Sequence, residues 1–362
     1  PQVGTLAISG GSEISGISGI EMRAGTLKIS GNVSVVATAE EFSVSDLNDG
    51  PRFGGVALGV SRYFEGSDRG VTLDISGGTF VAQDKGYAFY EKDIAVAGAE
   101  DNTSLSFAGA TFNGDLYSEN EVGFIKGGTF SEVVDKGYIA EGSDLYVTEA
   151  GTLEVAPEGS APAVSSKVVA TIGSKGYGSV SDAVSNAKEN DTIKLYGDVT
   201  ENVTINKSVT LDLNGYTLEN KNTTSGNYLL IEGGNSEAEN IKVTIRNGNI
   251  SSGDAAVIVM GYADVVMENV SVKTDGRYGL ELYGECDQSV TAEDCTFEGD
   301  TSGVVVFGAE KTGMTAAFSA TGCTIKGGDY GVSGNGTYHL TTIDIVDSKV
   351  SSDRGTAIYH PQ

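Results

Sequence analysis

The sequence contains little positive charge and no long hydrophobic run. Its 362 residues include 23 Lys plus Arg against 50 Asp plus Glu, which gives a formal net charge of −27. An acidic surface of this kind repels phosphate backbones and anionic lipid. No apolar run approaches the roughly 18 residues that a membrane-spanning helix requires. We therefore expect neither nucleic-acid binding nor membrane insertion.

Cysteine is also scarce. Cys286, Cys295 and Cys323 are too few for a disulfide framework, and a low count suits exported bacterial proteins that fold without oxidation. Cys295 and Cys323 occupy the same place in the repeat described below, so we expect buried, reduced thiols rather than a disulfide. The sequence opens at Pro1 with no initiator Met or signal peptide, which suggests a processed or excised piece of a larger protein.

The residue types that are abundant favour short strands. Glycine reaches 51 residues with only 5 prolines, and Thr, Ser, Val and Ile are frequent. A chain of this length exceeds the usual single core, so either two domains or one elongated repeat architecture is expected. The composition favours the repeat.

A repeat is visible in the C-terminal half. An apolar strand is followed by a short polar turn, then in most copies Thr or Ser, then a large apolar residue, and these last residues are Ile250, Val272, Phe297, Ile325 and Val350. They step by 22, 25, 28 and 25 residues, which suits one turn of a β-helix with three short strands. Further strands are expected between them at 256–260, 279–283, 303–307 and 355–359.

The N-terminal half follows the same pattern at 75–80, 107–112 and 125–130, and in slightly longer form at 8–14 and 29–35. Alternation along each strand sends the large apolar residue inward, where it stacks on the coils above and below at roughly 4.8 Å. These residues are the expected core.

One segment has a helical pattern instead. Residues 179–190 place Val180, Ala183, Val184 and Ala187 on one face, and Ser179 has the spacing of an N-cap. A short amphipathic helix here, just before the strands at 193–195 and 203–205, would cover the open apolar end of a β-helix.

These segments resemble a known family. Residues 168–173, 177–184, 190–195 and 209–215 are similar to the opening of pectin-lyase-like β-helix repeats in bacterial surface proteins of the gut Gram-positive type, and 127–131 and 137–142 resemble the closing segment. The resemblance implies an all-β, right-handed parallel β-helix and an extracellular or cell-surface location.

The order of the halves is reversed relative to that family. Residues 1–157 correspond to the closing half of one β-helix repeat, 158–167 read as a linker, and 168–362 correspond to the opening half of the next. Residues 36–70 break the rhythm of the coils, so we expect a projecting loop there.

Catalytic residues are hard to find. Only His339 and His360 are present, and no tryptophan offers a sugar platform. Asp275, Asp287, Asp300 and Asp353 fall at coil corners and are read as turn formers, while the basic residues Arg246, Arg277, Lys311 and Arg354 lie in unrelated contexts. We assign no catalytic residue and no cofactor.

The absence of a catalytic set leaves other activities open. Residues 46–50 match a calcium loop only in part, so calcium is the alternative to having no cofactor. A polysaccharide lyase or glycosidase and a carbohydrate-binding β-helix are the alternatives, since outward aromatic rings could stack on a glycan.

A polar ladder is expected where Asn247, Asn269, Asp294 and Asp347 share one register at a corner.

The leading interpretation is a non-enzymatic structural repeat of an extracellular fibre or surface adhesin. Residues 355–362 look like the first strand of a coil whose next strand is supplied by residues 3–10 of another copy. Head-to-tail stacking would then propagate into filaments. The residues expected at this interface are Leu6, Ile8, Ile14, Ile345, Ile358 and Tyr359.

Overall fold

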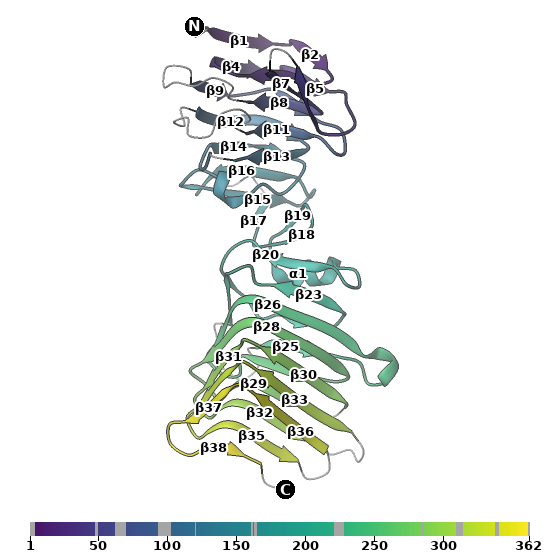
Figure 1. Ribbon diagram of the computed structural model, residues 1–362, viewed down its shortest axis with the longest axis vertical. Helices are drawn as coiled ribbons and strands as arrows, with labels where there is room; N and C mark the ends of the chain where they lie inside the picture. The colour runs from purple at the N-terminus through teal and green to yellow at the C-terminus, as the bar shows by residue number, and fades with distance from the viewer. Residues whose placement is uncertain are drawn as a thin grey trace. The chain divides into compact units, whose positions relative to one another are not determined.

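The computed structural model describes residues 4–47, 50–61, 70–92, 103–119, 121–160, 162, 165–220, 228–283, 286–308, 314–336 and 340–360 (Figure 1). The chain divides into two compact units, one formed by Pro1–Val168 with Ser174–Gly176 and the other by Val169–Gly173 with Tyr177–Gln362. In each unit, short strands pair in parallel with the strands one coil earlier and one coil later.

Each coil of the first unit contributes up to three strands. The first strands are β1 (Thr5–Gly10), β4 (Gly25–Gly31), β9 (Val71–Ile75), β12 (Thr103–Asn113) and β14 (Ile125–Phe130). The second strands are β2 (Glu13–Gly16), β5 (Ser34–Ala37) and β10 (Thr79–Val81). The third strands are β3 (Ile20–Met22), β8 (Val56–Val60), β11 (Tyr87–Glu91) and β13 (Asp115–Ser118), which form a separate sheet.

The repeat predicted for this half is confirmed residue by residue. Ile8 pairs with Ile29, Ile29 with Ile75 and Ile75 with Phe107. One strand further on, the inward column ends in three phenylalanines, Phe80, Phe112 and Phe130, whose rings stack with centroids 5.0 and 5.6 Å apart. Large apolar side chains therefore stack like on like through the core, as the spacing predicted.

The prediction of a long loop at 36–70 is wrong for much of this range, because three strands lie in it. Strands β6 (Ser43–Leu47) and β7 (Gly50–Gly54) form an antiparallel hairpin, and β8 is a third strand that pairs with β3 and β11. The five residues of β8 are all buried. The coil therefore resumes after the hairpin, because β8 supplies the apolar residues that its neighbouring coils require. Residues 62–69 lie outside the described part of the chain.

The first unit ends in antiparallel strands. Following the short 3-10 helix η1 (Lys136–Tyr138), β15 (Ser143–Thr148) pairs with β16 (Leu153–Pro157) and β17 (Ser165–Lys167), and β16 pairs with β14. The prediction of a linker at 158–167 is therefore wrong for its last three residues, which belong to the sheet. Their backbone groups form hydrogen bonds with the edge of β15 that would otherwise be unpaired.

The second unit is longer and more regular. After β18 (Ala170–Ile172) and β19 (Lys175–Tyr177), the first strands are β20 (Thr192–Leu195), β23 (Val209–Asp212), β26 (Ile241–Ser252), β28 (Ala263–Thr274), β30 (Gln288–Glu293), β33 (Thr315–Thr321) and β36 (Leu340–Val346). The second strands are β21 (Val199–Thr200), β24 (Thr217–Asn220), β31 (Thr296–Gly299), β34 (Thr324–Gly327) and β37 (Lys349–Ser352), with the later parts of β26 and β28. The third strands are β22 (Thr204–Ile205), β25 (Leu229–Glu232), β27 (Val257–Met260), β29 (Tyr278–Tyr283), β32 (Ser302–Gly308), β35 (Tyr330–Gly336) and β38 (Thr356–Tyr359), and a 3-10 helix, η2 (Glu237–Glu239), precedes β26.

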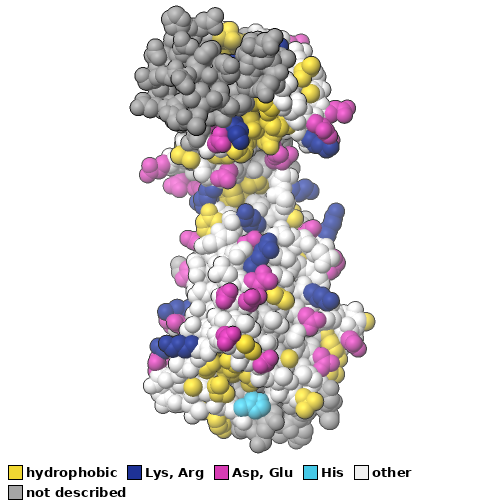
Figure 2. All heavy atoms as spheres, in the orientation of Figure 1, with side chains coloured by type: hydrophobic (Ala, Val, Ile, Leu, Met, Phe, Trp, Pro, Cys, Tyr) yellow, Lys and Arg dark blue, Asp and Glu magenta, His cyan; other side chains and the backbone are white. Residues whose placement is uncertain are grey.

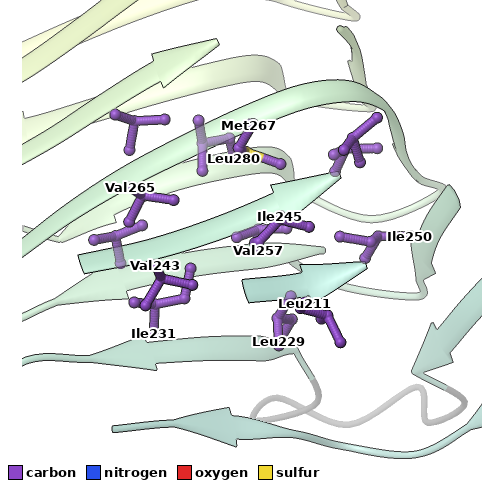
Figure 3. Packing of buried hydrophobic residues seen from close by; sticks show 14 of the residues in the cluster. Leu211, Leu229, Ile231, Val243, Ile245, Ile250, Val257, Val265, Met267 and Leu280 are labelled. Atoms are coloured by element: carbon purple, nitrogen blue, oxygen red, sulfur yellow. The ribbon is translucent and has the colours of Figure 1, made fainter. Parts of the chain in front are cut away.

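The register of this unit is also the predicted one. The five terminal apolar residues of the repeat pair in sequence order, from Ile250 with Val272 to Ile325 with Val350. Figure 3 shows the same stacking one strand earlier, where Val243 lies next to Val265 and Ile245 next to Met267.

The predicted helix is present but shorter. Helix α1 (Val180–Asn186) buries Val180, Ala183 and Val184 in the apolar cluster at the start of the second unit, against β18, β20 and β22 (Figure 1). It ends at Asn186 because Ala187 already has extended ψ. The helix covers the first coil, which is the position expected for a cap.

The N-terminus of α1 is held by two oxygen acceptors. The Ser179 hydroxyl accepts the Asp182 N–H at 3.0 Å, and the Glu201 carboxylate accepts the N–H groups of Val180 and Ser181 at 2.8 and 3.0 Å. Ser179→Ala should lower the free energy of unfolding by about 1 kcal/mol, because one N–H loses its acceptor. Urea unfolding followed by circular dichroism measures this, with Ser185→Ala on the exposed helix face as a control that should change little. Equal effects of the two variants would contradict the capping role.

Candidate assembly interface

The first coil of the first unit exposes apolar side chains. Leu6 is 47% exposed, and Ile8 and Ile14 are half-buried. Their partners one coil later, Leu27, Ile29 and Val35, are fully buried. The inward column therefore ends with one side of Leu6, Ile8 and Ile14 uncovered. Ile20 and Met22 on the third strand of the same coil are already buried, so the uncovered surface belongs to β1 and β2.

The last coil of the second unit has the same property. Ile345 is half-buried, whereas its partner Ala320 is fully buried, and Ile358 is 47% exposed above the fully buried Val332. Tyr359 is 45% exposed, but its ring already stacks on Tyr330 at 5.1 Å.

Val350, which ends the predicted repeat, and three residues that the sequence analysis did not assign to an end complete these two surfaces. Ile343 and Val350 are half-buried and, like Ile345, point inward. Glu13 in β2 and Lys349 in β37 are exposed, and each directly precedes the inward residue of its strand. The alternation of each strand was the available signal, since it marks the inward residue and the outward residue beside it.

The four polar residues predicted to form a ladder lie at one corner, and they share a backbone conformation. Asn247, Asn269, Asp294 and Asp347 all have positive φ, between 46° and 60°, and Gly322 completes the series at 67°. Asn, Asp and Gly are the residues that adopt this left-handed conformation most readily. In the first unit Gly10 and Gly31 pair with φ of 74° and 77°. The corner therefore selects these residue types for their backbone freedom.

The two repeat cysteines are buried and free, as predicted. The Cys295 N–H donates to Cys323 Sγ at 3.4 Å. The contact between the two thiols raises the pKa of Cys295 and lowers the pKa of Cys323 to about 7. Both side chains are only 2% exposed, so we assign the pair to core packing on its burial.

The corner after the second strands holds a recess of about 280 Å³ that the sequence reasoning did not foresee. It brings together Asp275, Asp300, Asp353 and Arg354, so the reading of Arg354 as an unrelated basic residue is wrong. Asp287 lies elsewhere, where its carboxylate accepts the Thr315 N–H at 2.6 Å.

All the basic side chains of this recess are paired with carboxylates. Lys273 pairs with Glu298 at 3.0 Å and Lys326 with Asp353 at 2.9 Å. Arg354 reaches both Asp300 at 3.0 Å and Asp329 at 3.1 Å, which links three successive coils. A set of acids and bases tied together in this way stabilises the stacking and leaves little charge for catalysis.

One carboxyl pair in the first unit has an altered acidity. A hydrogen bond with Asp115, together with burial, raises the pKa of Glu132 to about 7. A carboxyl that keeps its proton near neutral pH is a property of general acids. However, the paired carboxyls of glycosidases stand about 5 Å or more apart, whereas these two hydrogen-bond to each other. The arrangement favours a shared proton.

The described residues contain no group of three or more His, Cys, Asp or Glu side chains that could hold a metal ion. The weak calcium-loop match includes residues 48 and 49, which lie outside the described ranges. Among the helices described, none has the length and apolar character to cross a membrane.

Comparison with known proteins supports the fold. Residues 197–350, somewhat less than half of the chain, match the family described as the right handed beta helix region. The predicted class, an all-β right-handed parallel β-helix, is confirmed. No curated protein matched the chain.

Two solved structures were found with low similarity. The A-module of the mannuronan C-5 epimerase AlgE6 of Azotobacter vinelandii shows 11% identity and a TM-score of 0.25, with 100% of this chain and 91% of that chain covered. The A-module of AlgE4 from the same organism shows 13% identity and a TM-score of 0.16, with 94% and 89% covered.

Proposed function

We propose that this protein is a non-enzymatic structural repeat of an extracellular fibre or surface adhesin, and that copies of it stack end to end through their β-helix coils. The observation that carries the proposal is the match between the two uncovered surfaces. Each consists of apolar side chains whose partners one coil inward are fully buried. Uncovered apolar side chains and unpaired strand edges favour the addition of a further coil.

The residues at the two ends can be aligned. Ile343, Ile345 and Val350 at one end would lie opposite Leu6, Ile8 and Ile14 of the next copy. The step from Ile8 to Ile14 is one residue longer than the step from Ile345 to Val350, and the first unit already pairs two such unequal steps, 29–35 and 75–80. The corner also agrees, because Gly10 and Asp347, each two residues after the aligned isoleucine, both have positive φ. A stacked copy would thus continue the inward columns and the left-handed corner without a break.

The charges at the two ends also agree. With Val350 opposite Ile14, Lys349 of one copy lies opposite Glu13 of the next. Oppositely charged neighbours across paired strands contribute roughly 0.2–1 kcal/mol. Gly10 opposite Asp347 places no second carboxylate at the corner. Because the two surfaces differ, the contact is heterologous and produces open filaments rather than closed dimers.

Ile8→Lys or Ile345→Lys should abolish filament formation. Either substitution places an ammonium group in the apolar contact, where it has no partner and loses its hydration. Sedimentation velocity and electron microscopy should show filaments for the unsubstituted chain and monomers for both variants. Val266→Lys is the control, since Val266 is 37% exposed on the outer face of β28, away from both ends.

A charge exchange tests the register itself. Lys349→Glu alone faces Glu13 with a like charge and should weaken assembly, whereas Lys349→Glu combined with Glu13→Lys should restore it. A chain that stays monomeric at high concentration, or a double variant no better than the single one, contradicts the stacking proposed here.

A further inference from the structure

One position at the corner carries a polar side chain in the last three coils of the second unit. It lies directly before the residues that pair as second strands, and we call the residues at this position in both units the corner column. The strand pairing gives its members in the second unit, in chain order, as Gly248, Val270, Cys295, Cys323 and Ser348. The side chains thus change from small or apolar to thiol and hydroxyl toward the open end.

The thiols and the hydroxyl of this column accept backbone hydrogen bonds from the coil before them. The Cys295 N–H donates to Cys323 Sγ at 3.4 Å, and the Cys323 N–H donates to Ser348 Oγ at 2.9 Å. The Ser348 hydroxyl itself donates to the Val346 carbonyl of its own coil at 2.7 Å. Each coil therefore supplies the acceptor for one N–H of the coil that precedes it.

In the first unit, the corner column has a hydroxyl only in the first coil. Its members there are, in chain order, Ser12, Val33, Gly78, Ala110 and Gly128. Ser12 is exposed, and its hydroxyl donates to the Ser9 carbonyl of its own coil at 3.0 Å. This contact repeats the one between Ser348 and Val346. A hydroxyl oxygen has two lone pairs, so Ser12 can accept a hydrogen bond as well.

The stack proposed above brings the two ends of the corner column together. With Lys349 opposite Glu13 of the next copy, the residues directly before them, Ser348 and Ser12, also lie opposite each other. The corner of the first coil is one residue longer than that of the last coil. The same difference in length occurs within the first unit, where the position before the second strand stays in register.

We propose that the Ser12 hydroxyl accepts the Ser348 N–H of the preceding copy in the stack, as Ser348 does for Cys323 within the chain. This proposal rests on the end-to-end stacking proposed above. It identifies the chemical group that the open end of the last coil selects in its partner, a hydroxyl or thiol at the corner. A coil with a purely apolar corner would leave the Ser348 N–H without an acceptor.

The surroundings of this hydrogen bond make it important for assembly. Ile345 and Val350, on either side of Ser348 in the sequence, are half-buried and pack against the core. Figure 2 shows hydrophobic side chains grouped on the second unit where Figure 1 has its last coils, β35 to β38. In the stack, the Ser348 N–H would be enclosed by these side chains. An enclosed N–H without an acceptor costs more free energy than a hydrogen bond in water.

Ser12→Ala tests the proposal. The lowest protein concentration at which filaments form, measured by sedimentation, should rise about tenfold or more, because the enclosed N–H loses its acceptor. Ser12→Cys gives the first coil the residue type that the column has at 295 and 323, so it should assemble at close to the concentration of the unsubstituted chain. Ser9→Ala, on the exposed outer face of β1 in the same coil, is the matched control and should have no effect.

Hydrogen exchange distinguishes the loss of this bond from a general weakening of the contact. The Ser348 amide should exchange more slowly in filaments of the unsubstituted chain than in the free chain, and Ser12→Ala filaments should lose most of that protection. Urea unfolding of the free chain should be the same for Ser12→Ala and the unsubstituted chain, since Ser12 is exposed.

The outcomes separate this contact from stacking as a whole. If Ser12→Ala forms filaments at the concentration of the unsubstituted chain, or if Ser12→Cys is as weak as Ser12→Ala, the hydroxyl is not the acceptor, while stacking stands. If the unsubstituted chain forms no filaments, both the stacking and the contact between Ser12 and Ser348 are wrong.

Discussion

Phe107→Ala should lower the free energy of unfolding of the first unit by about 3–5 kcal/mol. Phe107 is fully buried, and its ring lies 4.9 Å from Phe89 and 5.1 Å from both Phe112 and Phe124. Truncation removes contacts on three sides, and the backbone of the stacked coils cannot collapse into the space. The loss is measured by urea unfolding and by hydrogen exchange of the amides in β9, β12 and β14.

Phe107→Leu provides the control for that experiment. It keeps most of the volume, so it should cost distinctly less than the alanine variant. The exchange of amides in the second unit should change in neither variant. Similar losses for leucine and alanine would mean that the aromatic contacts around Phe107 contribute little.

Gly328→Ala should destabilise the second unit by about 1–3 kcal/mol or more, as overpacking does. An added Cβ at this position would fall far inside contact distance of the Asp300 carbonyl oxygen and of the Arg354 guanidinium. Gly328 therefore allows Arg354 to pass over its coil and reach Asp300 two coils away. Equilibrium unfolding in urea measures the loss.

The combination with Arg354→Ala separates the two clashes. If the guanidinium is the main obstacle, Gly328→Ala should cost much less when Arg354 is already alanine. If the Asp300 carbonyl is the main obstacle, the cost should be the same in both backgrounds, since the Asp300 backbone is held by its N–H bond to the Gly276 carbonyl. Tolerance of Gly328→Ala in the unsubstituted chain would contradict the close approach itself.

The sequence alone was sufficient for the coil and its register. The pairing of Phe297 with Ile325 follows from strand alternation combined with steps of 22 to 28 residues, and the pairing of Ile75 with Phe107 follows from the repeat pattern shared by 75–80 and 107–112. A one-residue slip would move every apolar side chain from the core to the surface, so this pattern permits one register. The N-cap at Ser179 could be predicted from the residues that follow it, and the burial of Cys295 and Cys323 from their place in the repeat.

Other features could be seen only in the tertiary structure. They depend on which residues of neighbouring coils come together, and the turns between strands differ too much in length for the sequence to show this. The hairpin at 43–54 and the return of β8 to its sheet depend on pairing with β3 and β11, which no spacing of the sequence marks. The Asp300–Arg354 ion pair spans 54 residues. Glu281 faces outward between the core residues Leu280 and Leu282 and is nevertheless only 6% exposed. Strand alternation predicts whether a side chain points inward or outward. How far an outward side chain is buried depends on the side chains of the neighbouring coils, which the alternation does not describe.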